Sequence, residues 1–248
     1  LPLLFQQDYE SGVGLQGMTP FPKEMALGAA NSPELAYKYG KSVALECRSL
    51  GINWVLHPVA DLNMNPLNPI VNTRSVSDNP EKAVCLLSEQ IKGLQDNSVA
   101  ATIKHFPGDG IEELDQHLVM GINTLECDEW DRTYGKVYQE LIDAGIESIM
   151  AGHIALPAYS RKLRPGIKDQ EICPATLAPE LLQDLLRGKM GFNGLIVSDA
   201  THMVGMTSAM PRRLQVPMAI AAGCDMFLFF NDPEEDFQFM MDGYCSGI

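Results

Sequence analysis

The stretch VAATIKHFPGDGIEELDQH, residues 99–117, passes from an apolar run into a loop that carries glycines, a proline and charged residues. The run has the length of one buried β-strand, and it ends at Lys104 and His105. Short apolar runs that end in polar residues recur along the whole chain. These runs are PLLFQQD (2–8), INWVLHPVADLN (52–63), VAATIKH (99–105), IESIMAGH (146–153), GLIVSDA (194–200) and DMFLFFND (225–232).

Segments with helical periodicity separate the runs. PELAYKYGKSVALECRSLG (33–51) ends on Gly51, and PATLAPELLQDLLRGKMGF (174–192) begins with Pro and Thr and reaches Gly191, so both are expected to be amphipathic helices. Strands that alternate with helices pair in parallel, and parallel α/β folds place their active sites at the carboxyl ends of the strands. The polar ends of the six runs therefore mark the expected site.

This regularity favours a (β/α)8 TIM-type barrel, formed as a single domain by residues 1–248, over a doubly wound sheet. The motif GxxxxGK[ST] is missing from the sequence, and the single GxGxxG match, GVGLQG (12–17), leads into the proline-containing stretch MTPFP and not into a helical pattern, so a nucleotide-binding fold is not favoured. Six strand–helix units are two short of a closed barrel. We therefore expect either that the first one or two strands precede Leu1 or that the barrel is irregular.

The composition narrows the classes of function. The chain has 248 residues, 46% of them hydrophobic, and a net charge of −14. Nucleic acids and anionic membranes would repel such a surface, so we expect neither as a partner and instead expect a small neutral or cationic ligand. No apolar run is long enough to span a membrane and no signal peptide is visible. The six cysteines lack a C-x-x-C spacing and are expected to be reduced and buried.

Three polar groups near the first two strands are candidates for binding a ligand. Asp8 follows the first run and precedes two glycines, where it either contacts a ligand or caps a turn. The long Pro/Asn-rich loop after the second run ends near Arg74 and is a candidate substrate clamp. His57 and Asp61 lie in the same region, and for His57 burial at the barrel rim is the favoured interpretation.

The stretch 104–117 carries the second group of candidates. Lys104 and His105 are neighbours on a strand, so one side chain is expected to point into the barrel mouth and the other beside it. Asp115 and His117 can lie on one side only if the chain is extended, and the carboxylate then fixes the tautomer of the imidazole. The alternative is a solvated polar turn.

Asp199 ends the run GLIVSDA between two small residues. A carboxylate at this position can serve as a nucleophile, a base or a metal ligand. The histidines at 105, 117, 153 and 202 could in principle join it around a metal, but no H-x-H or HExxH spacing is present. We therefore predict no metal and no cofactor.

In these motifs the sequence resembles the catalytic domain of glycoside hydrolase family 3, in particular its β-N-acetylglucosaminidase (NagZ-like) branch. The matching pieces are DYESG (8–12), LGINWVLHPVADLNMNP (50–66), NTRS (72–75), KHFPGDG (104–110), DQH (115–117), MAGH (150–153), PATLAPELLQDLLRGKMGFNGLIVSDA (174–200) and AAGCDMFLF (221–229). The family has D-S-H where this sequence has DQH (115–117), and two further residues depart from the family pattern. Asp109 replaces the His of KHFPGHG and adds negative charge near the loop, and Ser11 replaces the first Gly of an E-G-G motif.

The resemblance implies a role for each candidate. Asp199 would be the nucleophile of a retaining glycosidase, and His117 the general acid/base with Asp115 as its partner. The hydroxyls of the sugar would be bound by Asp8, Arg74, Lys104 and His105, and His153 would line the same pocket. The implied substrate is a terminal β-linked N-acetylglucosaminide, such as a muropeptide in peptidoglycan recycling or a chitin oligomer.

Three alternatives remain beside this prediction. The chain could be a β-glucosidase of the same family, or a phosphorylase, because a neutral imidazole repels an incoming phosphate less than a carboxylate would. It could also be a sugar-binding barrel without turnover, although the retention of Asp199 and of the Asp-x-His pair argues against this.

Overall fold

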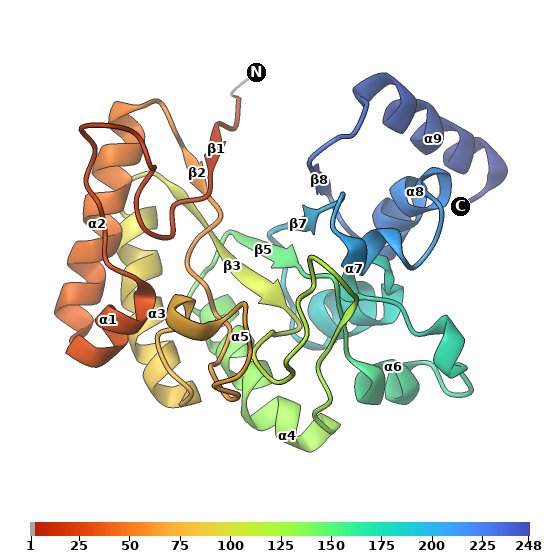
Figure 1. Cartoon of the computed structure of the whole chain (residues 1–248), viewed down its shortest axis with the longest axis horizontal. Coiled ribbons are helices and arrows are strands. Elements are labelled where there is room, and N and C mark those ends of the chain that lie inside the picture. The colour runs from red at the N-terminus through yellow and green to blue at the C-terminus, as the bar shows by residue number, and fades with distance from the viewer. Residues whose placement is uncertain (1–2) are drawn as a thin grey trace.

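A computed structural model describes residues 3–248, so Pro2, the first residue of the first apolar run, lies outside the described residues. Each of the six runs contributes one strand to a single sheet, in the order β1-β2-β3-β5-β7-β8 (Figure 1). The strands are β1 (Gln6–Gln7), β2 (Trp54–Val55), β3 (Ala100–Phe106), β5 (Ser148–Ala151), β7 (Leu195–Ala200) and β8 (Met226–Leu228).

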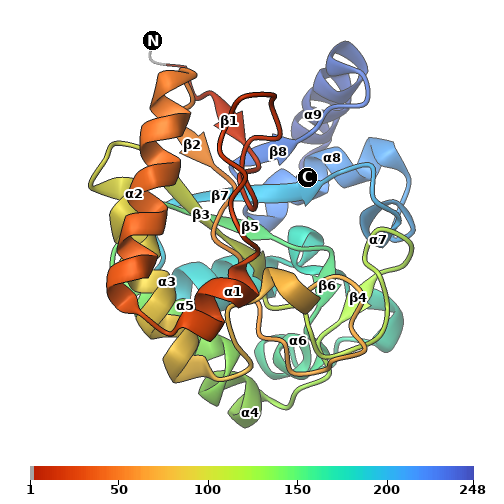
Figure 2. The ribbon, with the colours of Figure 1, turned by 60° about the vertical axis from the view of Figure 1, so that its left-hand side comes forward.

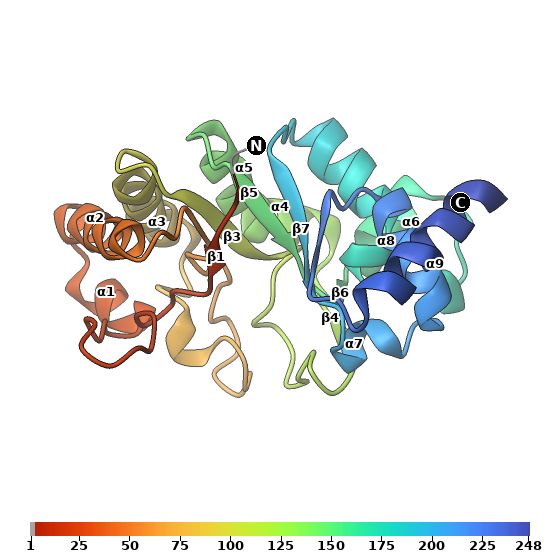
Figure 3. The same cartoon turned by 90° about the horizontal axis from the view of Figure 1, so that it is seen from above.

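All neighbouring strands of this sheet pair in parallel, and each new strand joins on the same side as the one before it. A doubly wound sheet would reverse its strand order, whereas barrels keep this regular progression. A second pair of short parallel strands, β4 (Gly121–Ile122) and β6 (Ile154–Ala155), lies beside α6 (Pro157–Leu163) and α7 (Val204–Thr207) (Figure 2). The six-stranded sheet curls into a half-barrel (Figure 3), which confirms the predicted α/β class as a partial TIM-type barrel.

The helices that follow the strands cover the outside of the sheet. They are α1 (Glu24–Ala30), α2 (Pro33–Ser49), α3 (Pro80–Gln95), α4 (Cys127–Arg132), α5 (Tyr134–Asp143), α6 (Pro157–Leu163), α7 (Val204–Thr207), α8 (Arg212–Ala222) and α9 (Pro233–Ser246). Short 3-10 helices are η1 (Asn72–Arg74), η2 (Asp169–Glu171) and η3 (Ala175–Leu177), and η4 (Glu180–Lys189) is a π-helix.

The predicted helix at 33–51 is confirmed as α2. The Ser32 hydroxyl accepts a hydrogen bond from the Leu35 N–H at its start, and Gly51 has a positive φ of 79° just beyond its end. α2 packs closely on α3 at Gly40, where a Cβ would lie only 2.1 Å from the Gln90 carbonyl oxygen. The absence of a side chain at this glycine lets the two backbones approach.

The prediction of one helix over 174–192 is wrong at its start. The segment forms η3 and then η4, which begins only at Glu180. Pro179 disfavours a helical conformation in the residue before it, and Ala178 is indeed extended, with φ −112° and ψ 95°. The predicted end is confirmed, since Gly191 has a φ of 72°.

All six cysteines are free, as predicted, but their burial differs. Cys47 and Cys224 are buried, whereas Cys85 and Cys245 are exposed on α3 and α9, so the expectation of general burial is wrong for these two. Among residues 3–248, every helix is too short or too polar to cross a lipid bilayer.

Candidate active site

A cavity of about 610 Å³ opens where the carboxyl ends of the strands meet. Loops after β1, β2, β3, β7 and β8 contribute to its wall, as expected for a barrel-type active site. Most of the predicted site residues are among those that line it. They are Asp8, Arg74, Lys104, His105, His117 and Asp199.

Asp199 lies near the end of β7 and is 8% exposed. Its Oδ1 accepts a hydrogen bond of 2.7 Å from the N–H of Ala200. Burial raises the pKa of the Asp199 carboxyl, but its electrostatic interactions with His105, His153 and Lys104 and the hydrogen bond from the Ala200 N–H outweigh burial and hold the pKa below its usual value. The cavity therefore contains an ionised carboxylate with one oxygen left for chemistry.

A cluster of charged groups forms another part of the wall. Lys104 Nζ lies 2.7 Å from Asp8 Oδ1 and 2.8 Å from Glu10 Oε1. Arg74 donates two hydrogen bonds to Glu10, one from Nε of 2.7 Å and one from Nη2 of 2.6 Å. The side chain of Lys104 is almost fully buried, so these carboxylates compensate a cation that would otherwise be costly in the protein interior.

The pKa values of this cluster follow from its pairing. Burial raises the pKa of Glu10, but the hydrogen bonds and charges of Arg74 and Lys104 dominate and hold it far below its ordinary value. Burial lowers the pKa of Lys104, and the carboxylates of Glu10 and Asp8 more than restore it, so the net shift is upward. Sequence reasoning missed Glu10. Its i, i+2 spacing from Asp8 after a strand was the available signal, because alternate residues of an extended chain point the same way.

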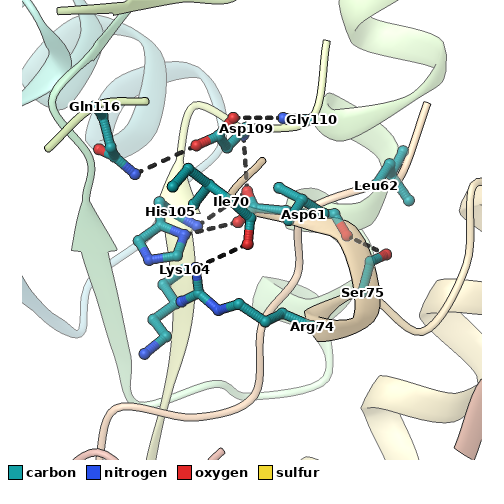
Figure 4. A network of polar contacts seen from close by, with 12 residues as sticks. Asp61, Leu62, Ile70, Arg74, Ser75, Lys104, His105, Asp109, Gly110 and Gln116 are labelled. Atoms are coloured by element: carbon teal, nitrogen blue, oxygen red, sulfur yellow. Dashed lines mark hydrogen bonds and ion pairs between the residues drawn. The ribbon is translucent and has the colours of Figure 1, made fainter. Parts of the chain in front are cut away.

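His105 is oriented by Asp61, a residue for which the sequence left both contact with a ligand and burial at the barrel rim open (Figure 4). Asp61 Oδ2 lies 2.7 Å from His105 Nδ1, and Oδ1 accepts the N–H groups of His105 and Asp109 at 3.1 and 2.8 Å. Lys104 and His105 both line the cavity, so the expected alternation of their side chains is wrong. The pairing of β3 with β5 is irregular between Ile103 and Phe106, and regular alternation is lost there.

The predicted contact between Asp115 and His117 is present, with 2.6 Å between Asp115 Oδ1 and His117 Nδ1. The predicted extended backbone is wrong. Asp115 begins a turn: its carbonyl accepts the N–H of Leu118 at 2.8 Å, and its Oδ1 also accepts the N–H of His117 at 2.8 Å. This turn brings the imidazole back to the carboxylate, while the side chain of His117 remains 55% exposed at the cavity. The pair thus lies within a solvated turn and still meets the geometry of an oriented imidazole.

The structure places His153 beneath the cavity and not in its wall. Its side chain is fully buried, its Nδ1 lies 2.9 Å from the Thr176 hydroxyl, and its Nε2 lies 2.9 Å from the Ala200 carbonyl oxygen. Both ring nitrogens are occupied, so the expectation that His153 contacts a ligand does not fit this arrangement. Burial lowers the pKa of His153, which the nearby Asp199 carboxylate opposes only in part.

His57 is buried, as predicted, and its Nε2 lies 2.7 Å from Gln90 Nε2 and 3.2 Å from Glu24 Oε1. Within residues 3–248, no three His, Cys, Asp or Glu side chains converge in the manner of a metal site.

Residues 1–243 match the model of the glycosyl hydrolase family 3 N terminal domain. The chain belongs to glycosyl hydrolase family 3. It is 45% identical over 250 residues to the β-N-acetylglucosaminidase/β-glucosidase of Cellulomonas fimi, a match that covers 100% of this chain and 44% of the relative. It is 32% identical to β-hexosaminidase A of Pseudoalteromonas piscicida, over 84% of this chain and 36% of that protein. The family predicted from the sequence motifs is confirmed.

Solved structures of family 3 proteins have the same fold. The β-glucoside phosphorylase BglX superposes with a TM-score of 0.96 and 40% identity, over 100% of this chain and 45% of that one. A family 3 β-N-acetylglucosaminidase from Paenibacillus sp. str. FPU-7 gives a TM-score of 0.89 and 32% identity, over 100% and 46%. The chain therefore spans less than half the length of these proteins.

The main departure from the family 3 motifs, Asp109, is buried within the site. Its Oδ1 accepts hydrogen bonds from Asn68 Nδ2 at 2.9 Å and from the Gly110 N–H at 2.6 Å, and its Oδ2 accepts Gln116 Nε2 at 3.4 Å (Figure 4). Burial, followed by the charge of Asp61, raises the pKa of the Asp109 carboxyl. Polar groups of the loop thus surround Asp109, and its carboxyl holds a proton more readily than an exposed aspartate does.

Proposed function

We propose that residues 1–248 act as one catalytic domain of a retaining glycosidase that hydrolyses terminal β-linked N-acetylglucosamine. The observation that carries this proposal is that Asp199 and His117, which Asp115 contacts, line one cavity, with the charged cluster of Lys104 and Arg74 in its wall. A carboxylate and a proton-transfer group across a sugar-sized cavity are the two groups that a retaining mechanism needs.

In the first step, Asp199 attacks the anomeric carbon of the sugar and forms a covalent ester. The bond to the leaving oxygen breaks as His117 donates the proton on its Nε2 to that oxygen. Asp115 accepts the proton on Nδ1 in a hydrogen bond throughout, so it stabilises the imidazolium before the transfer. The depressed pKa of Asp199 keeps the nucleophile ionised while His117 is protonated.

In the second step, the neutral imidazole of His117 takes a proton from water as the water oxygen attacks the anomeric carbon, and the bond between that carbon and the Asp199 oxygen breaks. The sugar leaves, Asp199 is released as a carboxylate, and His117 is again protonated. One residue therefore serves first as acid and then as base.

The substrate is held by the charged wall. Asp8, Arg74, Lys104 and His105 present donors and acceptors that suit the hydroxyl groups of one small carbohydrate, and Glu10 fixes the two cations in place. His153 contributes by supporting the strand end that carries Asp199, through its contact with the Ala200 carbonyl. A muropeptide or a chitin oligomer would supply the terminal N-acetylglucosamine.

Phosphorolysis is a second candidate function, in which inorganic phosphate replaces water in the second step. The neutral imidazole repels a phosphate less than a carboxylate base would. The likeness to the β-glucoside phosphorylase BglX, with a TM-score of 0.96, also favours it. The name of the Cellulomonas fimi relative includes β-glucosidase, so a β-glucoside is the competing sugar.

The test is turnover of 4-nitrophenyl N-acetyl-β-glucosaminide and of the matching β-glucoside by the full-length protein, each with and without phosphate. We expect faster release from the N-acetyl substrate and free sugar as the product. A sugar 1-phosphate as the main product would establish phosphorolysis, and preference for the glucoside would correct the substrate. Asp199→Ala should lose several orders of magnitude in rate on either substrate; retention of a tenth of the rate would overturn the mechanism.

A further inference from the structure

Gln116, the residue between Asp115 and His117, is buried although both of its neighbours are at least partly exposed. It is 1% exposed, whereas the side chain of His117 is 55% exposed. A glutamine buried in the middle of a solvated turn costs free energy unless its amide is hydrogen-bonded. Its contacts therefore indicate what holds this turn in place.

The amide of Gln116 forms two hydrogen bonds with separate parts of the barrel. Its Oε1 accepts the backbone N–H of His153 at 3.1 Å, and its Nε2 donates to Asp109 Oδ2 at 3.4 Å. His153 follows β5 and Asp109 follows β3. One side chain thus joins the turn to the ends of two adjacent strands (Figure 4 shows the contact with Asp109).

The backbone of the turn is tied to a third element. The carbonyl of Gln116 accepts the N–H of Gly205 at 3.1 Å, and the carbonyl of His117 accepts the N–H of Val204 at 3.1 Å. Val204 and Gly205 open α7, which follows the strand that carries Asp199. These contacts connect the turn that carries His117 to the helix that follows the strand of Asp199.

The two partners of the side-chain bond both depart from the family pattern. Where the family motifs read KHFPGHG and D-S-H, this chain has KHFPGDG and DQH. The two altered residues, Asp109 and Gln116, are hydrogen-bonded to each other.

We propose that Gln116 is a positioning residue, which holds the His117–Asp115 pair over Asp199 through Asp109 and the His153 N–H. This proposal rests on the proposed function. Gln116 takes no part in proton transfer. Its loss should therefore impair only the steps that need His117, and it should leave the attack of Asp199 on an activated sugar nearly unchanged.

A 5-fluoro glycosyl fluoride of the preferred sugar separates these steps in the full-length protein. Formation of its covalent adduct needs Asp199 and little acid assistance, because fluoride is a good leaving group, whereas hydrolysis of the adduct needs a base. We would compare wild type, Gln116→Met and His117→Ala. Gln90→Met serves as the control, since Gln90 is a buried glutamine whose amide contacts His57 and Glu24 and not the turn.

For Gln116→Met we expect inactivation within about threefold of wild type and reactivation about 10- to 100-fold slower, a smaller loss than removal of the base itself causes. Gln90→Met should reactivate like wild type. Gln116→Glu, which keeps the size of the side chain but sets a second carboxylate against Asp109, should show the same pattern as Gln116→Met. It replaces that variant if Gln116→Met does not fold.

Reactivation of both Gln116 variants within threefold of wild type, with His117→Ala slow, would overturn the positioning role and leave the proposed function intact. Equal slowing of inactivation and reactivation would also overturn it, because that pattern indicates general damage to the site. Failure of wild type to form an adduct on Asp199 would instead overturn the proposed function.

Discussion

Arg74 and Glu10 form two parallel hydrogen bonds, of 2.7 Å from Nε to Oε2 and 2.6 Å from Nη2 to Oε1. The same carboxylate lies 2.8 Å from Lys104 Nζ, so one acid orients both cations of the cavity wall. Such bidentate pairs combine charge with a fixed geometry. Glu10 therefore fixes the positions of the two cations in the cavity wall.

Glu10→Gln should weaken binding of an N-acetylglucosamine-like inhibitor about tenfold or more, because a hydrogen bond to a charged group contributes about 1.5–3 kcal/mol. The inhibition constant measures this effect directly. Glu34→Gln is a suitable control, since Glu34 pairs with Lys38 on the exposed surface of α2. Equal inhibition of wild type and Glu10→Gln would show that the geometry of the cations does not matter for binding.

Glu24 gives a prediction about stability and pH. It is buried, its Oε1 accepts a hydrogen bond from Gln90, and its Oε2 has no partner among the described residues. Burial, and then the charge of Glu10, raises the pKa of Glu24 to about 8, despite the Gln90 hydrogen bond. The folded protein therefore holds a proton on Glu24 that the unfolded chain releases at a pH near its ordinary pKa of 4.5.

The sign of the effect follows from proton linkage. Between pH 4.5 and 8 the folded state binds more protons at Glu24 than the unfolded state, so this contribution to stability falls as the pH rises. A glutamine at position 24 resembles the protonated acid and cannot titrate. Glu24→Gln should therefore remove this decrease in stability with rising pH. In urea unfolding, the free energy of unfolding of Glu24→Gln relative to that of wild type should rise by about 1 kcal/mol or more between pH 6 and pH 8.5, since one pKa unit corresponds to about 1.4 kcal/mol. A constant difference across this range would contradict the raised pKa.

The fold and half of the site could be predicted because their signals are local. Apolar runs that end in polar residues marked all six strands of the sheet, and the same ends placed Lys104 and Asp199 in the cavity. Contacts between distant residues left no comparable signal. The importance of Glu10 depends on Arg74, which is 64 residues away, and the ring of His153 is occupied by Thr176 and Ala200.

The backbone conformation of the turn at 115–117 could not be predicted from the sequence pattern either. An i, i+2 pair on one side indicates an extended chain when only the backbone direction is considered. Here the Asp115 carboxylate accepts both the backbone N–H and the ring nitrogen of His117, and this local hydrogen bonding stabilises a turn instead. The chemical pairing was predictable, whereas the backbone that achieves it was not.

Gly205→Ala should displace that turn from α7. A Cβ at Gly205 would lie 2.6 Å from the Gln116 carbonyl oxygen and 2.9 Å from the His153 Cβ. A backbone oxygen cannot remain at 2.6 Å from a methyl carbon, so the turn at 115–117 must shift away from α7. We expect kcat/KM for a substrate with a poor leaving group to fall about tenfold or more, as misplacement by about an ångström can cost around 100-fold.

Gly188→Ala is the matched control for this change. The nearest atom to a Cβ at Gly188 is the Gln183 carbonyl oxygen at 3.2 Å, and this glycine lies in η4, on the outside of the barrel. It should retain wild-type rates on all leaving groups. Wild-type rates for Gly205→Ala as well would mean that the contact with α7 does not position His117.

The acid/base role of His117 predicts how its loss depends on the leaving group. A poor leaving group needs a proton to depart, whereas 4-nitrophenolate leaves with little help, so His117→Ala should slow natural-type substrates far more than activated ones in the first step. Hydrolysis of the covalent intermediate in the second step needs a base, whichever leaving group departed in the first step. With activated substrates the covalent intermediate should therefore accumulate, and azide, which needs no base, should restore turnover.

Asp115→Ala should show a milder form of the same behaviour, because the imidazole remains but loses the 2.6 Å contact that fixes its tautomer and orientation. The measurement is the slope of log kcat/KM against the pKa of the leaving group for wild type and both variants. A slope for His117→Ala that is no steeper than that of wild type, together with no acceleration by azide, would transfer the acid/base role to another residue. The exposed turn at 115–117 would then be a surface feature at the cavity mouth, and the neighbouring Asp109, buried but with a raised pKa, would be the next acid to test.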